Sequence, residues 1–232
     1  MATPRGFFIT GTDTGVGKTR TACALLRALR SAGIRTTAMK PVAAGAVTDA
    51  QGLLNEDVAA LIAAGALTAP RALINPYCFA PAIAPHIAAA KTGVAIDLEV
   101  IARAFESLAV GAECVVVEGA GGFCVPLGDT IDGGDLAQRL GLPVILVVGL
   151  RLGCLNHALL TAQAIRVRGL ALAGWIANHI DPAMPVLQEN VAALIERLDA
   201  PLLAEFTYTP ETMAAQINCQ FNLTQLGIAR VR

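Results

Sequence analysis

Hydrophobic residues fall into short uninterrupted runs that alternate with longer stretches in which apolar positions recur every three or four residues. Uninterrupted runs of strand length are typical of parallel strands that are buried on both faces of a sheet. We expect strands at residues 6–10, 36–39, 114–117, 143–148, 172–178 and 202–206. We expect helices near residues 17–32, 56–64, 98–108, 156–168 and 186–198. This alternation predicts an α/β fold in which helices cover both faces of a mostly parallel sheet.

Chain length and composition favour one folded domain over residues 1–232, with no internal repeat and no shift in composition. Hydrophobic residues make up 55% of the chain and charged residues only 15%, which argues against disorder. The net charge of −1 and the lack of a basic stripe argue against electrostatic binding of nucleic acid. The periodicity weakens from about residue 207, so the tail stays unassigned.

No apolar stretch of the sequence is long enough to suggest a membrane protein or a secreted protein. The most apolar stretch, residues 143–150, is far shorter than the roughly 20 residues that a membrane helix needs. The run before Gly11 is too short for the core of a signal peptide. We therefore expect a cytoplasmic protein without a membrane partner.

Cysteines and histidines give no sign of a disulfide framework or a transition-metal site. The six cysteines are scattered singly with no C-x-x-C pair, so most are expected to be small buried residues. His86, His157 and His179 lack the spacing of metal ligands. No convincing pair of nucleophile and base is visible in the sequence.

A glycine-rich segment, Gly-Thr-Asp-Thr-Gly-Val-Gly-Lys-Thr at residues 11–19, lies between the first predicted strand and the first predicted helix. In that context the pattern predicts a Walker A loop, whose backbone N–H groups cradle phosphate oxygens. Lys18 would reach the β- and γ-phosphates, and the Thr19 hydroxyl would bind Mg²⁺. The expected ATP-binding residues here are Gly15, Val16, Gly17, Lys18 and Thr19. The strict pattern places glycine at position 12, but this chain has Thr12 there and glycine at Gly11, one residue earlier.

This loop makes a three-layer fold of the P-loop NTPase type the expected architecture, although a chance Gly-Lys-Thr at a helix start is the alternative. Glu118 ends the strand at residues 114–117, at the edge where parallel sheets bind ligands. A carboxylate there can hold Mg²⁺, while an ordinary acid at a strand end is the alternative. The backbone of Gly119, Ala120 and Gly121 can approach a nucleotide closely.

Three other polar residues are candidates of lower specificity. Asp57 opens a predicted helix, where the helix dipole alone favours an acid. Asp13 either reaches the metal or shapes the turn. Lys40 follows a short strand at the ligand edge and can neutralise charge on a transferring phosphoryl group, although a lone lysine is more often a surface residue.

Taken together, these segments resemble the dethiobiotin synthetase family, in order and over nearly the whole chain to about residue 205. The matching segments are residues 11–19, Met-Lys-Pro-Val at 39–42, Asn-Pro-Tyr at 75–77, Pro-His at 85–86, Val-Glu-Gly-Ala-Gly-Gly at 117–122 and Leu-Gly-Cys-Leu-Asn-His at 152–157. The last two are far more specific than the loop alone. Members of that family are homodimeric P-loop ligases. They carboxylate one amine of diaminopelargonic acid with CO₂, phosphorylate the carbamate with ATP and close a ureido ring.

The resemblance implies a role for each matching residue. Lys18 and Lys40 would stabilise charge on the phosphates and the carbamate, and Thr14 would contact the reacting end. The implied Mg²⁺ ligands are Thr19, Asp57 and Glu118. The start of a helix at Gly153, Cys154 and Asn156 would receive the substrate carboxylate of the partner subunit. Asn178, at a strand end, would read the adenine.

Three positions depart from the family pattern. Ala44, in the expected substrate site, stands where a serine is common, which removes one hydrogen bond worth about 0.5–1.5 kcal/mol. His179 stands where an aspartate is expected, and residues 206–209 lack the usual proline of the base-binding turn. The first departure concerns substrate affinity and the other two concern nucleotide preference.

Two other functions remain open. One is a related P-loop amide ligase that acts on another diamine or carboxylate. The other is a ParA/MinD-like ATP switch, a class that typically carries an additional lysine early in the loop. This chain has Asp13 at that point and no basic or amphipathic membrane surface in the sequence.

Overall fold

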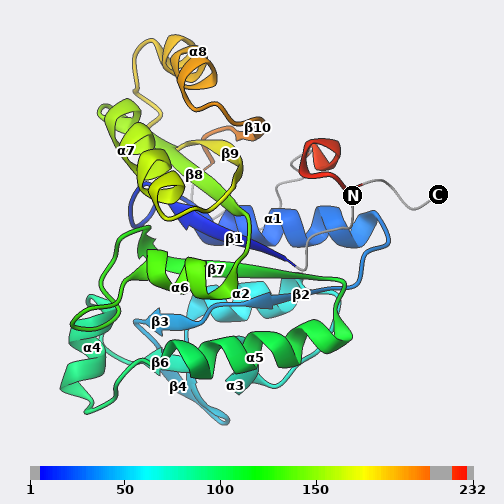
Figure 1. Ribbon diagram of the computed structural model, residues 1–232, viewed down its shortest axis with the longest axis vertical. Helices are drawn as coiled ribbons and strands as arrows, with labels where there is room; N and C mark the ends of the chain where they lie inside the picture. Colours follow the sequence, from blue (N-terminus) through cyan, green and yellow to red (C-terminus); the bar gives the residue numbers. More distant parts are fainter. Residues whose placement is uncertain (1–5, 210–220, 229–232) are drawn as a thin grey trace.

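The computed structural model describes residues 6–209 and 221–228 and has three layers, with helices on both faces of a central sheet (Figure 1). The sheet has six strands in the order β10-β9-β8-β1-β7-β2, and every neighbouring pair is parallel. Within the described residues, no helix is long and apolar enough to cross a membrane. The predicted fold class is therefore confirmed.

The six strands lie close to where the hydrophobic runs predict them. Their bounds are β1 Gly6–Gly11, β2 Thr36–Met39, β7 Cys114–Gly122, β8 Val144–Leu150, β9 Leu172–His179 and β10 Leu202–Phe206. Every residue of β8 is buried, as expected for a strand covered on both faces. β1 lies at the centre, and its neighbours β7 and β8 lead to opposite sides of the sheet. This branching opens a ligand crevice at the carboxyl end of β1.

In residues 6–209 and 221–228, six longer helices surround the sheet. They are α1 Lys18–Ser31, α2 Glu56–Ala64, α5 Leu98–Gly111, α6 Gly133–Leu140, α7 Cys154–Val167 and α8 Leu187–Arg197. Successive strand residues point to opposite faces, so Phe7 and Ile9 pack in the core of α1 while Phe8 packs in the core of α5 and α6. On the latter face, Trp175 and residues of β8 form a third core with α7 and α8.

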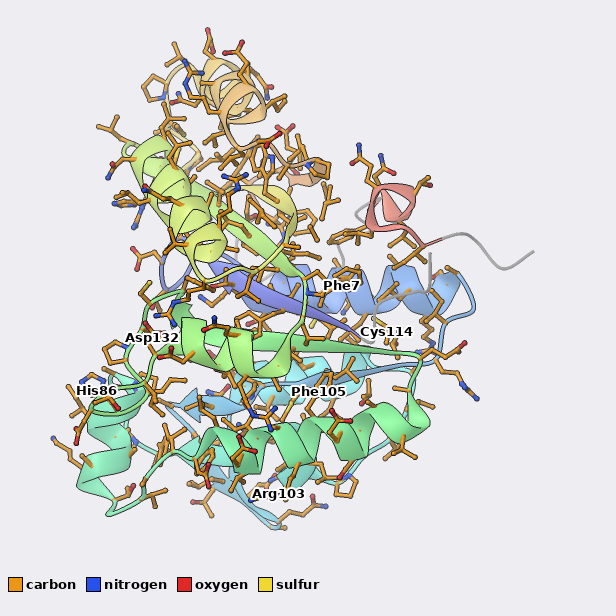
Figure 2. All side chains as sticks on the ribbon, in the orientation of Figure 1. Phe7, His86, Arg103, Phe105, Cys114 and Asp132 are labelled. Carbon is orange, nitrogen blue, oxygen red and sulfur yellow. The ribbon has the colours of Figure 1, made fainter. Side chains whose placement is uncertain are left out.

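The two sides of α5 illustrate how the helices are held. Phe105 is 3% exposed and points at the sheet, whereas Arg103, two residues earlier, points into solvent (Figure 2). Cys114, at the start of β7, is fully buried. Cys23 and Cys154 are buried as well, Cys78 is half-buried and Cys124 is exposed. All five of these thiols are free, while Cys219 lies outside the described residues.

Helix α6 is not predicted by the sequence because it starts with two glycines, Gly133 and Gly134. A reciprocal capping box between Asp132 and Asp135 supports it. Arg168, just after α7, donates to both carboxylates, at 2.7 Å and 2.5 Å. Side-chain capping and a tertiary ion pair thus outweigh the low helix propensity of glycine.

The region between β2 and α5 also contains short elements that the sequence pattern does not reveal. They are β3 Val42–Ala44, β4 Val47–Asp49, β5 Gly52–Leu54, α3 Arg71–Ile74, β6 Tyr77–Phe79 and α4 Pro85–Lys91. β3 pairs with β6, and β4 forms a small hairpin with β5. These elements are too short to show a hydrophobic period.

Part of the unassigned tail is ordered against the face of α1. A short 3-10 helix, Leu223–Leu226, follows Phe221, whose ring meets Phe206 edge-on at 6.1 Å between centroids. Leu226 and Ile228 are buried in the α1 core. Residues 221–228 therefore pack on the same face of the sheet as α1.

Candidate active site

The carboxyl edge of the sheet collects most of the predicted site residues. The phosphate loop follows β1, Lys40 follows β2, Glu118 lies in β7, and Asn178 is near the end of β9. β7 is longer than predicted and continues to Gly122. Its register against β1 slips after Glu118, however, because Ile9 pairs with Glu118 and Gly11 pairs with Gly122. Regular pairing therefore stops at Glu118, and residues 119–121 bulge out of the ladder.

The phosphate loop is held in a wound conformation that glycine makes possible. Gly15 and Gly17 have φ values of 74° and 94°, in the region that favours glycine. A Cβ atom at Gly17 would come within 2.2 Å of the Asn178 amide nitrogen. The Thr12 N–H donates to the Val147 carbonyl of β8 at 3.0 Å. The loop backbone is thus anchored to the sheet on one side and to Asn178 on the other.

Lys18 begins α1 and is 7% exposed, and its Nζ donates to the Asp13 carbonyl at 2.9 Å. Burial lowers its pKa to about 8, with Lys40 acting in the same direction, although Glu118, Asp57 and Asp13 oppose the change. A buried ammonium at the start of a helix, beside a glycine-rich loop, gains stabilisation from an anion. The arrangement therefore suits a phosphate group.

Thr19, Asp57 and Glu118 bring three oxygen donors together from three separate elements. The Thr19 hydroxyl lies 2.7 Å from Asp57 Oδ1 and 2.8 Å from Glu118 Oε1. Asp57 lies in the first turn of α2, where Asn55 caps the helix by accepting from the Asp57 N–H. Glu118 is fully buried. The sheet edge and α2 therefore converge on the start of α1.

Lys40 neutralises this acidic group. Its Nζ lies 2.5 Å from Asp57 Oδ2 and 2.6 Å from Glu118 Oε1, and the residue is 6% exposed. Burial alone lowers the pKa of Lys40, but the two carboxylates outweigh it and raise the pKa above its ordinary value. Burial also raises the pKa of Asp57, and Lys40 reverses this effect, so that the carboxyl titrates below its ordinary value. Lys40 and Asp57 are both charged at neutral pH.

The three oxygens also fit a hard divalent cation. A hydroxyl has one hydrogen, yet Thr19 Oγ1 lies within hydrogen-bond distance of two carboxylate oxygens. The other Glu118 oxygen, Oε2, is buried and has no hydrogen-bond partner among the described residues. No group of three His, Cys, Asp or Glu residues suited to a metal occurs in residues 6–209 and 221–228. Two carboxylates and a hydroxyl suit Mg²⁺, which usually combines one or two carboxylates with substrate phosphates.

Two asparagines hold this cluster in place: Asn75, which lies in one of the matching segments but was given no role there, and Asn55, which the sequence did not single out. The Asn75 side chain donates to the Lys40 carbonyl at 2.6 Å and to the Tyr77 carbonyl at 3.0 Å. Asn55 donates to the carbonyl of Ala44 at 3.0 Å while it caps α2. Both asparagines are buried. They act on backbone groups, for which sequence patterns give no signal.

Residues 119–121, which are predicted to line the nucleotide, lie between the core and the phosphate loop. A Cβ atom at Gly119 would lie 3.1 Å from the ring of Phe8, so a side chain there would disturb the core. Gly121 has a φ of 61°, and a Cβ atom there would lie 3.6 Å from Thr14 Oγ1. Thr14 therefore faces the bulge in β7, with half-buried Ala120 between the two glycines.

The predicted carboxylate-binding turn lies at the same edge but not within the cluster. Helix α7 begins at Cys154, two residues before the predicted start, and Gly153 precedes it with a φ of 93° and no side-chain cap. Gly153 is exposed, Asn156 is exposed as well, and Cys154 is buried. An ion pair between Arg151 and Asp13, at 2.5 Å, ties this turn to the phosphate loop. Asp13 therefore faces Arg151 and not the carboxylates.

Asn178 lies on the other side of α1. Its Nδ2 donates to the Val16 carbonyl at 2.8 Å, and its Oδ1 accepts from Arg20 at 3.0 Å. No sequence pattern selects Arg20, which simply follows Gly-Lys-Thr in a helix. The side chain of the adjacent His179 contacts Glu205 of β10 at 2.8 Å.

Comparison with known proteins gives consistent matches. A family profile described as an AAA domain matches residues 5–216. An ATP-dependent dethiobiotin synthetase BioD from Aromatoleum aromaticum is 55% identical over 96% of this chain and 99% of its own length. A protein of the same name from Nitrosospira multiformis is 51% identical over 99% of this chain and 100% of its own length. Another, from Pseudomonas aeruginosa, is 51% identical over 96% of this chain and 98% of its own.

Among solved structures, the signal recognition particle receptor FtsY from Elizabethkingia anophelis has a TM-score of 0.52 at 15% identity. The match covers 97% of this chain and 65% of the receptor, so it bears on the fold alone. The high identity over nearly the full length of several synthetases is of a different kind, because it covers both the phosphate loop and the turn before α7. The chain belongs to the ATP-dependent dethiobiotin synthetase family.

Proposed function

We propose that this protein is a ring-forming carbon–nitrogen ligase that converts diaminopelargonic acid, CO₂ and ATP to dethiobiotin, ADP and phosphate. Membership of the family supports this function, as does the shared edge of the sheet on which the predicted residues lie. The observation that carries it is the position of Lys40, 2.5 Å from Asp57 and 2.6 Å from Glu118, directly beside the phosphate loop.

The reaction has three steps. One amine of the substrate attacks CO₂ and loses a proton, giving a carbamate. A carbamate oxygen then takes the γ-phosphoryl group of ATP, and ADP leaves. Finally the neighbouring amine attacks the carbamate carbon, loses a proton and expels inorganic phosphate, which closes the ureido ring.

In this scheme the protein positions reactants and stabilises charge, and it forms no covalent bond to them. Lys18 would bind the β- and γ-phosphates in place of the Asp13 carbonyl. Lys40 would turn from the carboxylates toward the carbamate and the transferring phosphoryl group. Thr14, exposed on the loop facing the β7 bulge, would contact the reacting end. The backbone of residues 15–17 and 119–121 would line the nucleotide.

Magnesium is the cation that these residues would hold, through Thr19, Asp57 and Glu118, and it would offset the charge of the ATP phosphates. Release of Lys40 from the two carboxylates leaves both of them free to act as ligands. The same acidic pair would therefore bind either the lysine ammonium or the metal. This exchange accounts for a Lys40 that is both buried and paired with carboxylates.

The substrate carboxylate would bind the start of α7 from the partner subunit of a homodimer. Gly153 leaves the first N–H groups of α7 without a side-chain cap, and such groups bind anions well. Asn156 is exposed on the first turn, and the nearby Leu152 is 91% exposed. Ala44, which is half-buried and offers no hydroxyl, would leave the substrate one hydrogen bond short.

The single-domain organisation and the cytoplasmic location stay predictions.

One alternative function is that of a related P-loop amide ligase that acts on another diamine or carboxylate. Such an enzyme would use the same phosphate site. A ParA/MinD-like switch is less well supported, because Asp13 occupies the early loop position and pairs with Arg151. No observation favours either of these functions over the ligase.

The test is phosphate release from MgATP by the purified protein, with bicarbonate and with or without diaminopelargonic acid. The ligase predicts release that requires the diamine and that matches the amount of dethiobiotin formed. A rate of ATP hydrolysis that does not depend on the diamine but increases with DNA or lipid vesicles would instead support the ATP switch.

A further inference from the structure

A second polar cluster, centred on Arg20, lies on the opposite side of α1 from Lys40. Arg20 is the third residue of the helix, directly after Thr19, so its side chain leaves the helix about 100° away from the threonine. It faces the ends of β9 and β10. These two strands are paired in parallel with Phe206 beside Asn178, so one side chain can reach both.

Arg20 contacts both polar groups and an aromatic ring at these strand ends. Nη1 donates to Asn178 Oδ1 at 3.0 Å, and Nη2 donates to the Thr207 carbonyl at 3.2 Å and to Thr209 Oγ1 at 3.3 Å. The guanidinium carbon also lies 4.8 Å from the centroid of the buried Phe206 ring. A planar, always charged group suits this combination of stacking and several donated bonds, which a lysine could not reproduce.

These contacts fix the orientation of the Asn178 side chain. A guanidinium can only donate, so the atom that faces Arg20 must be the amide oxygen. The Val16 carbonyl can only accept, so the atom that faces it must be the amide nitrogen. A flip would place two donors together and two acceptors together. Since Asn178 is only 3% exposed, water could not compensate for this mismatch.

The fixed amide has a defined capacity left for a ligand. A primary amide offers two N–H donors and two acceptor lone pairs, and the contacts to Val16 and Arg20 use one of each. The remaining N–H and lone pair match the N7 acceptor and N6 amino donor of adenine. Guanine presents two acceptors, N7 and O6, along the same edge. An amide held in this orientation would therefore set its oxygen against O6.

We propose that Arg20 is a positioning residue that holds the Asn178 amide in one orientation and so makes the site prefer adenine to guanine nucleotides. The proposal rests on the proposed function in taking Asn178 as the residue that reads the base. Arg20 also fastens residues 207–209, the segment that lacks the proline expected of the base-binding turn. In this chain, a side chain from α1 replaces the rigidity of that turn.

The decisive experiment measures the affinity of the full-length protein for MgATP and MgGTP by calorimetry, without diamine. Arg20→Ala removes a constraint on one bidentate contact to the base. The ratio of ATP affinity to GTP affinity should therefore fall about tenfold, mostly because the affinity for ATP falls. Arg20→Lys should be intermediate, because lysine keeps the charge but not the planar fork. Arg27→Ala, an exposed arginine on the same helix, should match the parent protein.

Kinetics separate this role from simple loss of structure. With saturating diamine, Arg20→Ala should raise the KM for ATP while kcat changes by less than about threefold, as expected when binding alone is lost. Emission of Trp175, the one tryptophan in the chain and fully buried, reports whether each variant is folded. Should Arg20→Ala not fold, Arg20→Lys decides the matter by the same ratio.

Equal losses of ATP and GTP affinity, or no change in either, would overturn the proposal. The calorimetric ratio needs no turnover, so it is independent of the substrate assignment. A parent protein without diamine-dependent phosphate release would refute the proposed function while the Arg20 result still stood. Conversely, an active ligase whose ATP-to-GTP ratio ignores Arg20 would refute only this inference.

Discussion

Two cationic side chains flank the start of α1, and they contact different kinds of group. Lys40 is buried against two carboxylates, Asp57 and Glu118, at 2.5 Å and 2.6 Å. The contacts of Arg20 include an amide oxygen, a carbonyl, a hydroxyl and an aromatic face. In the first cluster, the carboxylates can exchange the lysine for a metal ion, and the lysine can turn to a phosphate. In the second cluster, the contacts of the arginine orient neighbouring groups without changing their protonation.

This difference predicts which kinetic constant depends on which cluster. Charge that is redirected during phosphoryl transfer stabilises the transition state and acts on kcat. Groups that orient a base, far from the reacting atoms, contribute equally before and during the reaction and act on KM. Four substitutions test the division, from the largest expected effect to the smallest.

Lys40→Ala should have the largest effect on turnover. Loss of one charged group that stabilises the transition state lowers kcat by about 10²–10³-fold, while the affinity for MgATP should change much less. Steady-state phosphate release and nucleotide calorimetry measure the two. Lys91→Ala, at the exposed end of α4, is the control. An unchanged kcat would remove Lys40 from the catalytic role.

Gly17→Ala should disturb both the phosphate loop and Asn178. The φ of 94° at this position costs a residue with a side chain about 1–3 kcal/mol, and its Cβ would come within 2.2 Å of Asn178 Nδ2. Affinity for MgATP should therefore fall more than about tenfold. Gly33→Ala is a matched control, because Gly33 has a φ of 84° and a Cβ there would meet no atom within 4 Å. Equal effects of the two changes would show that strain alone, and not Asn178, is responsible.

Asn178→Ala should raise the KM for ATP about tenfold, the size expected for one bidentate base contact, and should leave kcat within about twofold. Asn190→Ala, at a half-buried position of α8, should leave both constants unchanged. A fall in kcat as large as that of Lys40→Ala would end the division between the two clusters.

Asp135→Ala, remote from both clusters, should affect stability alone. Burial raises the pKa of Asp135, but the Asp132 N–H and Arg168 outweigh it, so the folded pKa lies below the unfolded value. The contribution is therefore present above the unfolded pKa and is lost as the pH falls through the folded pKa.

Loss of this cap should lower the free energy of unfolding by about 1 kcal/mol at about pH 7, and the difference should shrink below about pH 4. Urea denaturation followed by Trp175 emission measures it, with exposed Asp129→Ala as the control. A difference that grows on acidification would contradict the sign. Altered kcat or KM would show that α6 is not independent of the site.

How far the sequence predicts each cluster follows from the same contrast. Lys40 and Glu118 follow or end hydrophobic runs, so the topology of a parallel sheet places both at one edge. Arg20 carries no such signal, because its partners are a strand end 158 positions away and a backbone carbonyl 187 positions away. Contacts to backbone groups, like those of Asn55 and Asn75, do not depend on a recognisable pair of residue types.

Secondary structure shows the same limit. The buried parallel strands are predictable because both of their faces are apolar, whereas α6 begins with two glycines and depends on Arg168 from a distant helix end. The β7 bulge after Glu118 also escapes prediction, since it arises from the pairing with β1. The sequence therefore predicts well which residues lie at the carboxyl edge of the sheet. It does not predict the contacts that hold those residues in place.

The central claim, that ATP phosphorylates a carbamate beside Lys18 and Lys40, is tested most directly with oxygen-labelled bicarbonate. The protein is mixed with MgATP, diaminopelargonic acid and freshly dissolved ¹⁸O-bicarbonate in unlabelled water, and the phosphate is analysed by mass spectrometry at short times. The account predicts that the phosphate released with dethiobiotin carries one labelled oxygen from the carbamate. Dethiobiotin formed together with unlabelled phosphate would contradict it.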